Sequence, residues 1–144
     1  IPAGKMKARR AHAVPLSKQV RGYLTDLAEM LGREGYVFPS ARSSKRPMSE
    51  NTLNAAFRRM GYSKEEVTAH GLRATASTFL NESGLWNPDA IERALAHGDS
   101  NVVRGIYHRG KHWDERVRMA QWWSDYLDEL RTGGKVIQGK FAKG

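Results

Sequence analysis

The chain has 144 residues, which suits one compact domain. Its apolar share of 40% is enough for a packed core and excludes wholesale disorder. Lysine and arginine number 24 against 15 aspartates and glutamates, so the net charge is +9. Such an excess is typical of a domain that binds a polyanion, with nucleic acid as the first candidate and an anionic membrane surface as the second. Because cysteine is absent, disulfides, thiolate catalysis and cysteine-type zinc sites are excluded.

The hydrophobic pattern predicts a mainly helical body with a small β-hairpin at its front. Residues 1–15 alternate weakly around a polar turn, which favours a hairpin. A helix then runs from the cap Ser17 to Gly32, and residues 36–39 are a short extended piece. A further helix is capped by Ser49, and we expect three of its apolar side chains to point inward: Leu53, Phe57 and Met60.

Helix start signals continue through the middle of the chain. Ser63 and Glu66 have the spacing of a capping box for one short turn. Thr68 caps a helix that ends near Gly84. Asn87 is followed by proline at a first helical position, which predicts another short helix.

Two more helices are expected toward the C-terminus. A short one begins at Ser100 and carries Tyr107 near its end. A long one covers about residues 113–130, with apolar side chains at offsets of three and four, namely Val117, Ala120, Trp123, Leu127 and Leu130. Because Trp122 and Trp123 fall on this periodic helix, we interpret them as packing residues.

Basic side chains gather in three clusters. The clusters are Lys5, Lys7, Arg9, Arg10, Lys18 and Arg21; then Arg42, Lys45, Arg46, Arg58 and Arg59; then Arg104, Arg109, Lys111, Arg116 and Arg118. Basic runs are commonly solvated faces, but three on one small domain favour a surface that follows phosphates. We expect DNA contacts from Arg9, Arg10, His12, Arg42, Lys45, Arg46, Asn51, Arg58, Arg59, Arg104, His108 and Arg109. For His12 a structural role is the equal alternative.

Candidate chemistry begins with Tyr107, which lies in the basic run RGIYHRG. Most tyrosines are packing residues, and a free phenol is a poor nucleophile, but nearby cations would favour the phenolate. His70 and Arg73 are three apart, so both lie on one helical face, although a buried histidine with a salt-bridged arginine is the simpler interpretation. His97 ends a predicted helix, and Lys7 lies in the hairpin turn.

These residues together suit phosphoryl transfer at a DNA backbone without a metal. Such a reaction needs cationic donors for the phosphate oxygens, an in-line nucleophile and an acid for the departing oxygen. No convincing carboxylate cluster for magnesium is visible, and His108 and His112, four apart, lack a third ligand for zinc. The prediction is therefore a site without metal or cofactor.

The order of the motifs GKMKARRAHAVPLS, TAHGLRATAST, LAHGDSNVVRGIYHR and WWSDYLDEL resembles the catalytic domain of tyrosine recombinases, the phage-integrase family. The chain is most similar to prophage and genomic-island integrases, over residues 1 to about 130. The resemblance implies their DNA breaking–rejoining fold, and it implies cleavage through a 3′-phosphotyrosyl link. Tyr107 would be the nucleophile and Lys7 the acid, while His70, Arg73 and His97 would hold the phosphate.

The family's first arginine, which lies upstream of the hairpin, is not in this sequence. The resemblance therefore implies a fragment, truncated at its N-terminus, that is weakly active or inactive by itself. Losing one of two arginine contacts should slow cleavage by about a hundredfold or more. Residues 1–130 would be the catalytic domain, and residues 131–144 a tail that is flexible or docks onto a neighbouring subunit.

The resemblance also implies the partners. They are duplex DNA at attachment or core sites, three further copies in a homotetramer on synapsed DNA, and accessory DNA-bending proteins, with a monomer expected in isolation. No run approaches the roughly 20 apolar residues that a membrane span needs, and no signal peptide is visible, so we expect a bacterial cytoplasmic protein that joins the nucleoid on DNA. Two alternatives remain: a DNA-binding domain that has lost catalysis, and a related tyrosine enzyme that only relaxes or resolves DNA.

Overall fold

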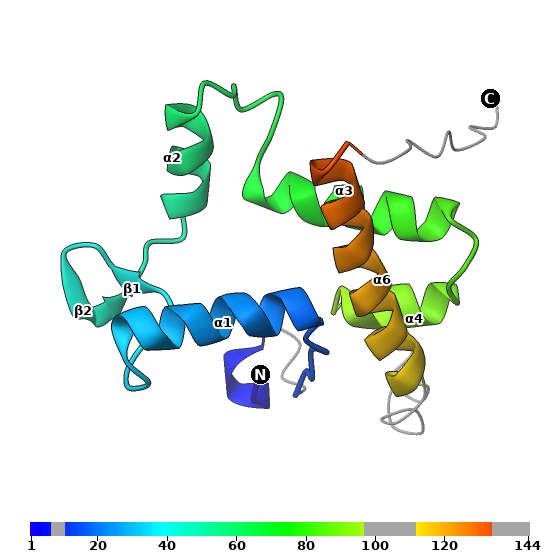
Figure 1. Ribbon diagram of the computed structural model, residues 1–144, viewed down its shortest axis with the longest axis horizontal. Helices are drawn as coiled ribbons and strands as arrows, with labels where there is room; N and C mark the ends of the chain where they lie inside the picture. The colour runs from blue at the N-terminus through cyan, green and yellow to red at the C-terminus, as the bar shows by residue number, and fades with distance from the viewer. Residues whose placement is uncertain (7–10, 97–111, 134–144) are drawn as a thin grey trace. The chain divides into compact units, whose positions relative to one another are not determined.

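The computed structural model describes residues 1–6, 11–96 and 112–133 (Figure 1). The elements in chain order are η1 (Ala3–Lys5), α1 (Lys18–Leu31), β1 (Pro39–Ser40), β2 (Ser43–Pro47), α2 (Thr52–Arg59), α3 (Ala69–Glu82), α4 (Pro88–Ala94) and α6 (Trp113–Arg131). They divide into two compact units. One holds residues 1–17 and those from 76 onward, and the other holds residues 18–75. The first half of helix α3 therefore belongs to the unit of residues 18–75, and its second half belongs to the unit that also holds residues 1–17.

The predicted fold class, mainly helical with a small antiparallel sheet, is confirmed, but the sheet lies in residues 39–47, and residues 1–6 and 11–15, the described part of the expected hairpin, contain no strand. In the described part of residues 1–15, Ile1 and His12 exchange two backbone hydrogen bonds, of 2.7 and 2.9 Å. The Lys5 and Met6 N–H groups instead donate to carbonyls three residues back. These local bonds make the turn η1, so the described backbone there forms no extended ladder.

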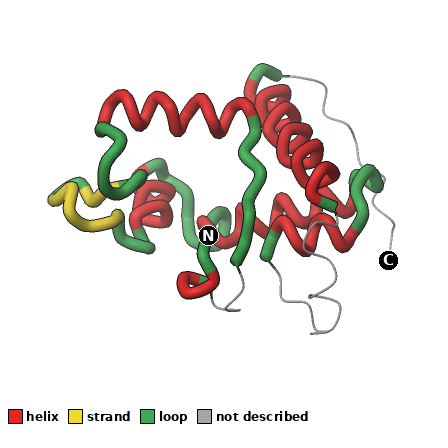
Figure 2. The backbone as a smooth tube through the Cα atoms, turned by 90° about the horizontal axis from the view of Figure 1, so that it is seen from below, coloured by secondary structure: helices red, strands yellow, loops and turns green. Residues whose placement is uncertain are grey.

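The two-stranded sheet is a short hairpin, drawn in yellow in Figure 2. Pro39 opposes Pro47 at its open end, and the Met48 N–H donates to the Phe38 carbonyl just beyond, at 2.8 Å. Proline has no N–H to give to a ladder, so it is tolerated at a strand end. The extended piece expected at residues 36–39 is therefore shifted toward the C-terminus, because the strand begins at Pro39.

The unit that contains α4 and α6 has a small apolar core. Leu80 of α3, Ile91 of α4 and Met119 of α6 are buried, and Trp86 and Trp122 pack against them. As predicted, α4 starts with Pro88 after the Asn87 cap, whose side chain accepts from the Asp89 N–H at 2.9 Å. Helices α4 and α6 pack side by side (Figure 1).

The buried face of α6 differs from the predicted one. Val117, Leu127 and Leu130 are 41%, 45% and 42% exposed. The helix instead buries Arg116 and Met119, and it turns aromatic rings toward its own unit. Tyr126 stacks on Trp122 with ring centroids 5.5 Å apart, and it lies 5.8 Å from Phe79 of α3. The expected packing role of the tryptophans is thus confirmed. Aromatic rings bury more area than leucine or valine side chains, so they determine which face of the helix is buried.

Helix α6 also holds the N-terminal segment of the chain. The Arg116 guanidinium donates to the Ala13 carbonyl and lies over the Trp113 ring, 5.5 Å from its centroid. The Ser124 hydroxyl donates to the Ser17 hydroxyl at 2.7 Å. Arg116 is only 8% exposed, so its place in a phosphate-following basic cluster was wrong. Burial lowers the pKa of this guanidinium from its ordinary value.

In the other unit, α2 is shorter and more exposed than expected. It starts at Thr52, and its cap Asn51 lies two residues after the predicted cap Ser49. Leu53 and Met60 are 47% and 69% exposed, so their predicted inward orientation was wrong, while Phe57 is half-buried. The helix is oriented by polar contacts on a different face, described below. In the described ranges, no helix is long and apolar enough to cross a bilayer.

Candidate functional site

His70 and Arg73 lie in the first turns of α3. His70 is exposed and Arg73 is half-buried. The Thr68 hydroxyl accepts from the Gly71 N–H at 2.8 Å, which confirms the predicted cap. A Cβ at position 71 would lie 3.0 Å from that hydroxyl, so glycine allows the cap to approach. Both candidate phosphate ligands therefore stand at the positive end of a helix, where an anion is favoured.

Helix α2 holds the start of α3 through two side chains one turn apart. The Asn54 Oδ1 accepts from the Ala69 N–H at 2.9 Å. The Arg58 guanidinium donates to the Val67 carbonyl and to the Tyr62 carbonyl. The two contacts from α2 to residues 67 and 69 lie on either side of the Thr68 cap.

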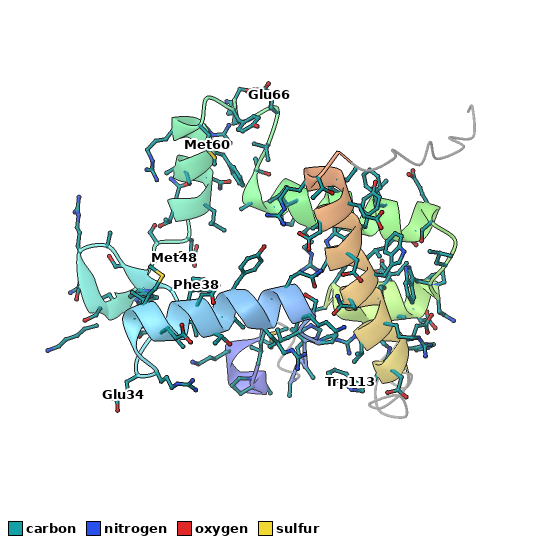
Figure 3. All side chains as sticks on the ribbon, viewed as in Figure 1. Glu34, Phe38, Met48, Met60, Glu66 and Trp113 are labelled. Carbon is teal, nitrogen blue, oxygen red and sulfur yellow. The ribbon has the colours of Figure 1, made fainter. Side chains whose placement is uncertain are left out.

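The turn between α2 and α3 is also fixed locally. Gly61 ends α2 with a positive φ of 95°. The Ser63 N–H donates to Glu66 Oε2 at 2.7 Å and the Glu66 N–H donates to the Ser63 hydroxyl at 3.3 Å, so the predicted capping box is confirmed. The hydrogen bond from the Ser63 backbone is the main cause that lowers the pKa of Glu66. Met60 and Glu66 mark the two sides of this turn in Figure 3.

The β1–β2 hairpin carries a basic tip. Arg42 lies in its turn, and Lys45 and Arg46 are adjacent on β2, so their side chains leave opposite faces of the strand. All three are exposed. The Ser40 and Ser43 hydroxyls accept from the Arg42 and Lys45 N–H groups, each at 3.3 Å, which stabilises the turn. The hairpin can therefore present positive charge in several directions at once.

The remaining predicted DNA contacts that are described have different surroundings. Asn51 and Arg59, at opposite ends of α2, are exposed, whereas Arg58 is half-buried and bound to backbone carbonyls. His12 is half-buried and pairs through its backbone with Ile1. An open hollow of about 1150 Å³ is lined by Leu27, Leu31, Phe38, Met48, Arg42 and Arg59. The assignment of these residues to DNA stays a prediction.

His112 belongs to a structural contact. Its Nδ1 lies 2.8 Å from Glu115 Oε2, while Glu115 Oε1 accepts from the Asn87 N–H at 2.8 Å. Among the described residues, no group of three or more histidine and acidic side chains could hold a metal ion.

Eight predicted site residues lie outside the described residues: Lys7, Arg9, Arg10, His97, Arg104, Tyr107, His108 and Arg109. Of the five predicted catalytic residues, the structure therefore describes two, His70 and Arg73, which lie three residues apart on α3. Sequence reasoning missed the contacts of Asn54 and Arg58 with the start of α3. No periodicity or motif signals them, since each joins residues 9 or 15 positions apart across a turn.

Comparison with known proteins decides the family. The model of the phage integrase family matches residues 1–112. The chain belongs to the phage integrase family. One relative, the integrase of Enterobacteria phage P4, is 49% identical to the chain over 129 residues, which cover 88% of the chain and 29% of the relative.

Two more relatives have similar coverage. Prophage integrase IntA of Escherichia coli K12 is 42% identical over 137 residues, which is 95% of the chain and 33% of IntA. The integrase of Shigella phage Sf6 is 41% identical over 130 residues, covering 90% of the chain and 33% of the relative. The chain therefore spans about a third of the length of these relatives. No solved structure matches it.

Proposed function

We propose that this chain is the catalytic part of a site-specific DNA recombinase, which cuts and rejoins duplex DNA through a 3′-phosphotyrosyl link. The observation that carries the proposal is the pair His70 and Arg73 on the capped start of α3, in a chain of the phage integrase family. Residues 1–130 form the catalytic domain, and residues 131–144 are a tail that is flexible or docks onto another subunit.

Arg73 and His70 bind the scissile phosphate. A guanidinium offers paired N–H donors to two non-bridging oxygens, and an imidazole adds a third. Negative charge grows on these oxygens as the phosphorus becomes pentacoordinate, so donors that are already in place favour the transition state over the ground state. The caps on α3 reduce the reorganisation needed when the phosphate arrives.

The other steps belong to residues outside the described part of the chain. Tyr107 attacks the phosphorus and loses its phenolic proton to solvent, and the bond from phosphorus to the 5′ oxygen breaks. Lys7 donates a proton to that oxygen, and His97 adds a further donor to the phosphate. Because the phosphotyrosyl ester keeps the energy of the broken bond, a 5′ hydroxyl of another strand can reverse the step without ATP or a metal.

The basic surface binds the duplex around the cut. The exposed hairpin residues Arg42, Lys45 and Arg46, all in the unit of residues 18–75, supply contacts to DNA phosphates. The working assembly is a homotetramer on two synapsed attachment sites, assisted by DNA-bending proteins, in the bacterial cytoplasm. Integration and excision of mobile DNA are the reactions it serves.

The test is covalent capture. The full-length protein that carries this chain is mixed with a nicked duplex bearing the attachment site, so that the cut strand diffuses away and the enzyme stays linked. We expect a protein–DNA adduct from wild type and none from Tyr107→Phe. Arg73→Lys should slow adduct formation by about a hundredfold, since one ammonium cannot replace a two-pronged donor. Tight duplex binding with no wild-type adduct would instead identify a DNA-binding domain without catalysis.

Adduct alone does not separate a recombinase from an enzyme that only relaxes or resolves DNA. A second assay therefore supplies two attachment-site duplexes of different length. Recombinant products of the predicted new lengths support the proposal, and adduct without exchanged products supports the relaxing or resolving activity.

A further inference from the structure

We propose that Asn54 and Arg58 of α2 are positioning residues that set where His70 and Arg73 stand, and that Arg58 is not primarily a DNA contact. This inference rests on the proposed function. It deepens that function by assigning two residues outside the expected catalytic set to the geometry of the phosphate site.

The backbone N–H groups at the start of α3 need acceptors from outside the helix ladder. The first N–H groups of a helix have no partner inside the helix. Thr68 takes the Gly71 N–H, and Asn54 takes the Ala69 N–H at 2.9 Å from outside the helix. Asn54 is half-buried, so water is a poor substitute for its amide oxygen.

Backbone carbonyls of the turn before α3 are held by the same helix α2. Arg58 donates to Val67 and Tyr62, so one guanidinium joins both ends of the turn that leads into α3. Asn54 and Arg58 are four residues apart and share a face of α2. Contacts at residues 67 and 69 from one rigid face restrict both the position and the tilt of the first turn of α3.

The candidate phosphate ligands lie close in sequence to the contact at Ala69. His70 directly follows Ala69, and Arg73 lies about one turn further on. A shift of about 1 Å at a reacting centre can cost about a hundredfold in rate, because transition-state contacts depend steeply on distance. A change at Asn54 or Arg58 should therefore reduce the rate of cleavage more than the affinity for DNA.

The experiment uses the full-length protein at saturating concentration on the nicked attachment-site duplex. Asn54→Ala should lower the rate constant of adduct formation by about 10- to 100-fold while the dissociation constant for DNA changes by less than about threefold. Asn54→Asp keeps an oxygen for the Ala69 N–H and should restore the rate. An Asn54→Ala rate equal to wild type would overturn the inference.

Arg58 gives an independent arm. Arg58→Lys keeps the charge but loses the paired guanidinium donors, so it should cleave as slowly as Arg58→Ala. Neither variant should change the slope of log affinity against log salt. If Lys restores the rate, or if Arg58→Ala lowers that slope by about one, then Arg58 is a phosphate contact and the inference fails for it. Arg33→Ala, which removes an exposed charge elsewhere in this unit, controls for charge loss.

Hydrogen exchange checks the contact itself. The Ala69 amide should exchange faster in Asn54→Ala and at the wild-type rate in Asn54→Asp, with amides of α6 unchanged. If Asn54→Ala does not fold, the Arg58→Lys arm decides. An adduct from wild type that disappears in Tyr107→Phe, together with normal rates in every α2 variant, removes only this inference. Absence of any wild-type adduct removes the proposed function and this inference with it.

Discussion

The Glu115 carboxylate of α6 accepts a hydrogen bond from the backbone N–H of Asn87, the cap of α4, at 2.8 Å. Its second oxygen lies 2.8 Å from His112 Nδ1. These contacts lower the pKa of Glu115, with the Asn87 hydrogen bond as the larger cause and His112 as the next. One carboxylate therefore joins the first turns of α4 and α6, two of the three helices that contribute to this unit's core.

Replacing Glu115 by glutamine should destabilise the protein at neutral pH. The amide can accept from Asn87 or from His112 but not from both, and it lacks the charge, so we expect a loss of about 1–2 kcal/mol in the free energy of unfolding. Since the folded-state pKa lies below the ordinary value of 4.5, the stabilisation is complete above that pH and is lost as pH falls through the folded-state pKa. Urea unfolding at pH 7 and below pH 4 measures the difference.

Glu129→Gln is the matched control for this experiment. Glu129 is an exposed acid on the same helix, so its replacement should change stability by less than about 0.5 kcal/mol. A difference between wild type and Glu115→Gln that is the same at both pH values would contradict the role of the ionised carboxylate.

Arg116→Ala should loosen the N-terminal segment. It removes the hydrogen bond to the Ala13 carbonyl and the contact with the Trp113 ring, at a cost of about 1–3 kcal/mol. Amides of residues 11–17 should exchange faster than in wild type. Arg118→Ala, an exposed arginine of the same helix, should leave both measurements close to wild type. Equal effects of the two variants would show that charge, and not the buried contact, matters.

Two glycine-to-alanine changes should have opposite signs. Gly61 has φ of 95°, a conformation that strains an L side chain, so Gly61→Ala should destabilise by about 1–2 kcal/mol. Gly22 lies inside α1, and an added methyl group would meet only open space there, so Gly22→Ala should stabilise by about 0.5–1 kcal/mol. Thermal unfolding of both variants tests the pair, and a stabilised Gly61→Ala would contradict the turn geometry.

The basic β1–β2 hairpin should affect how DNA affinity depends on salt concentration. If Lys45 contacts a phosphate, Lys45→Ala should lower the slope of log affinity against log salt by about one and weaken all duplex sequences alike. Lys64, an exposed lysine 3.7 Å from Glu65, is the comparison, and its removal should leave the slope unchanged. Fluorescence anisotropy over a range of salt concentrations gives both slopes. Identical slopes for Lys45→Ala and wild type would remove the hairpin from the DNA surface.

Helix starts and stops were predicted well because their causes are local. The cap Thr68, the Ser63–Glu66 box and the Asn87 cap each satisfy N–H groups within three residues of the same side chain. The weak alternation of apolar and polar residues predicted strands less well. It predicted strands in residues 1–15, where, within the described residues, a local turn takes the N–H groups of Lys5 and Met6.

Sequence alone determined the excess of basic charge, the caps of the helices and the ordered motifs that carry His70 and Arg73. Tertiary structure decided which side chains those elements bury. Arg116 is a surface cation by composition, yet it is buried, where it contacts a carbonyl of Ala13 and the Trp113 ring. Asn54 and Arg58 look like ordinary polar residues of a short helix, and only the folded turn brings the Ala69 N–H and the Val67 carbonyl within their reach. The physical reason is that hydrogen bonds between distant residues depend on chain geometry, which a local sequence pattern does not contain.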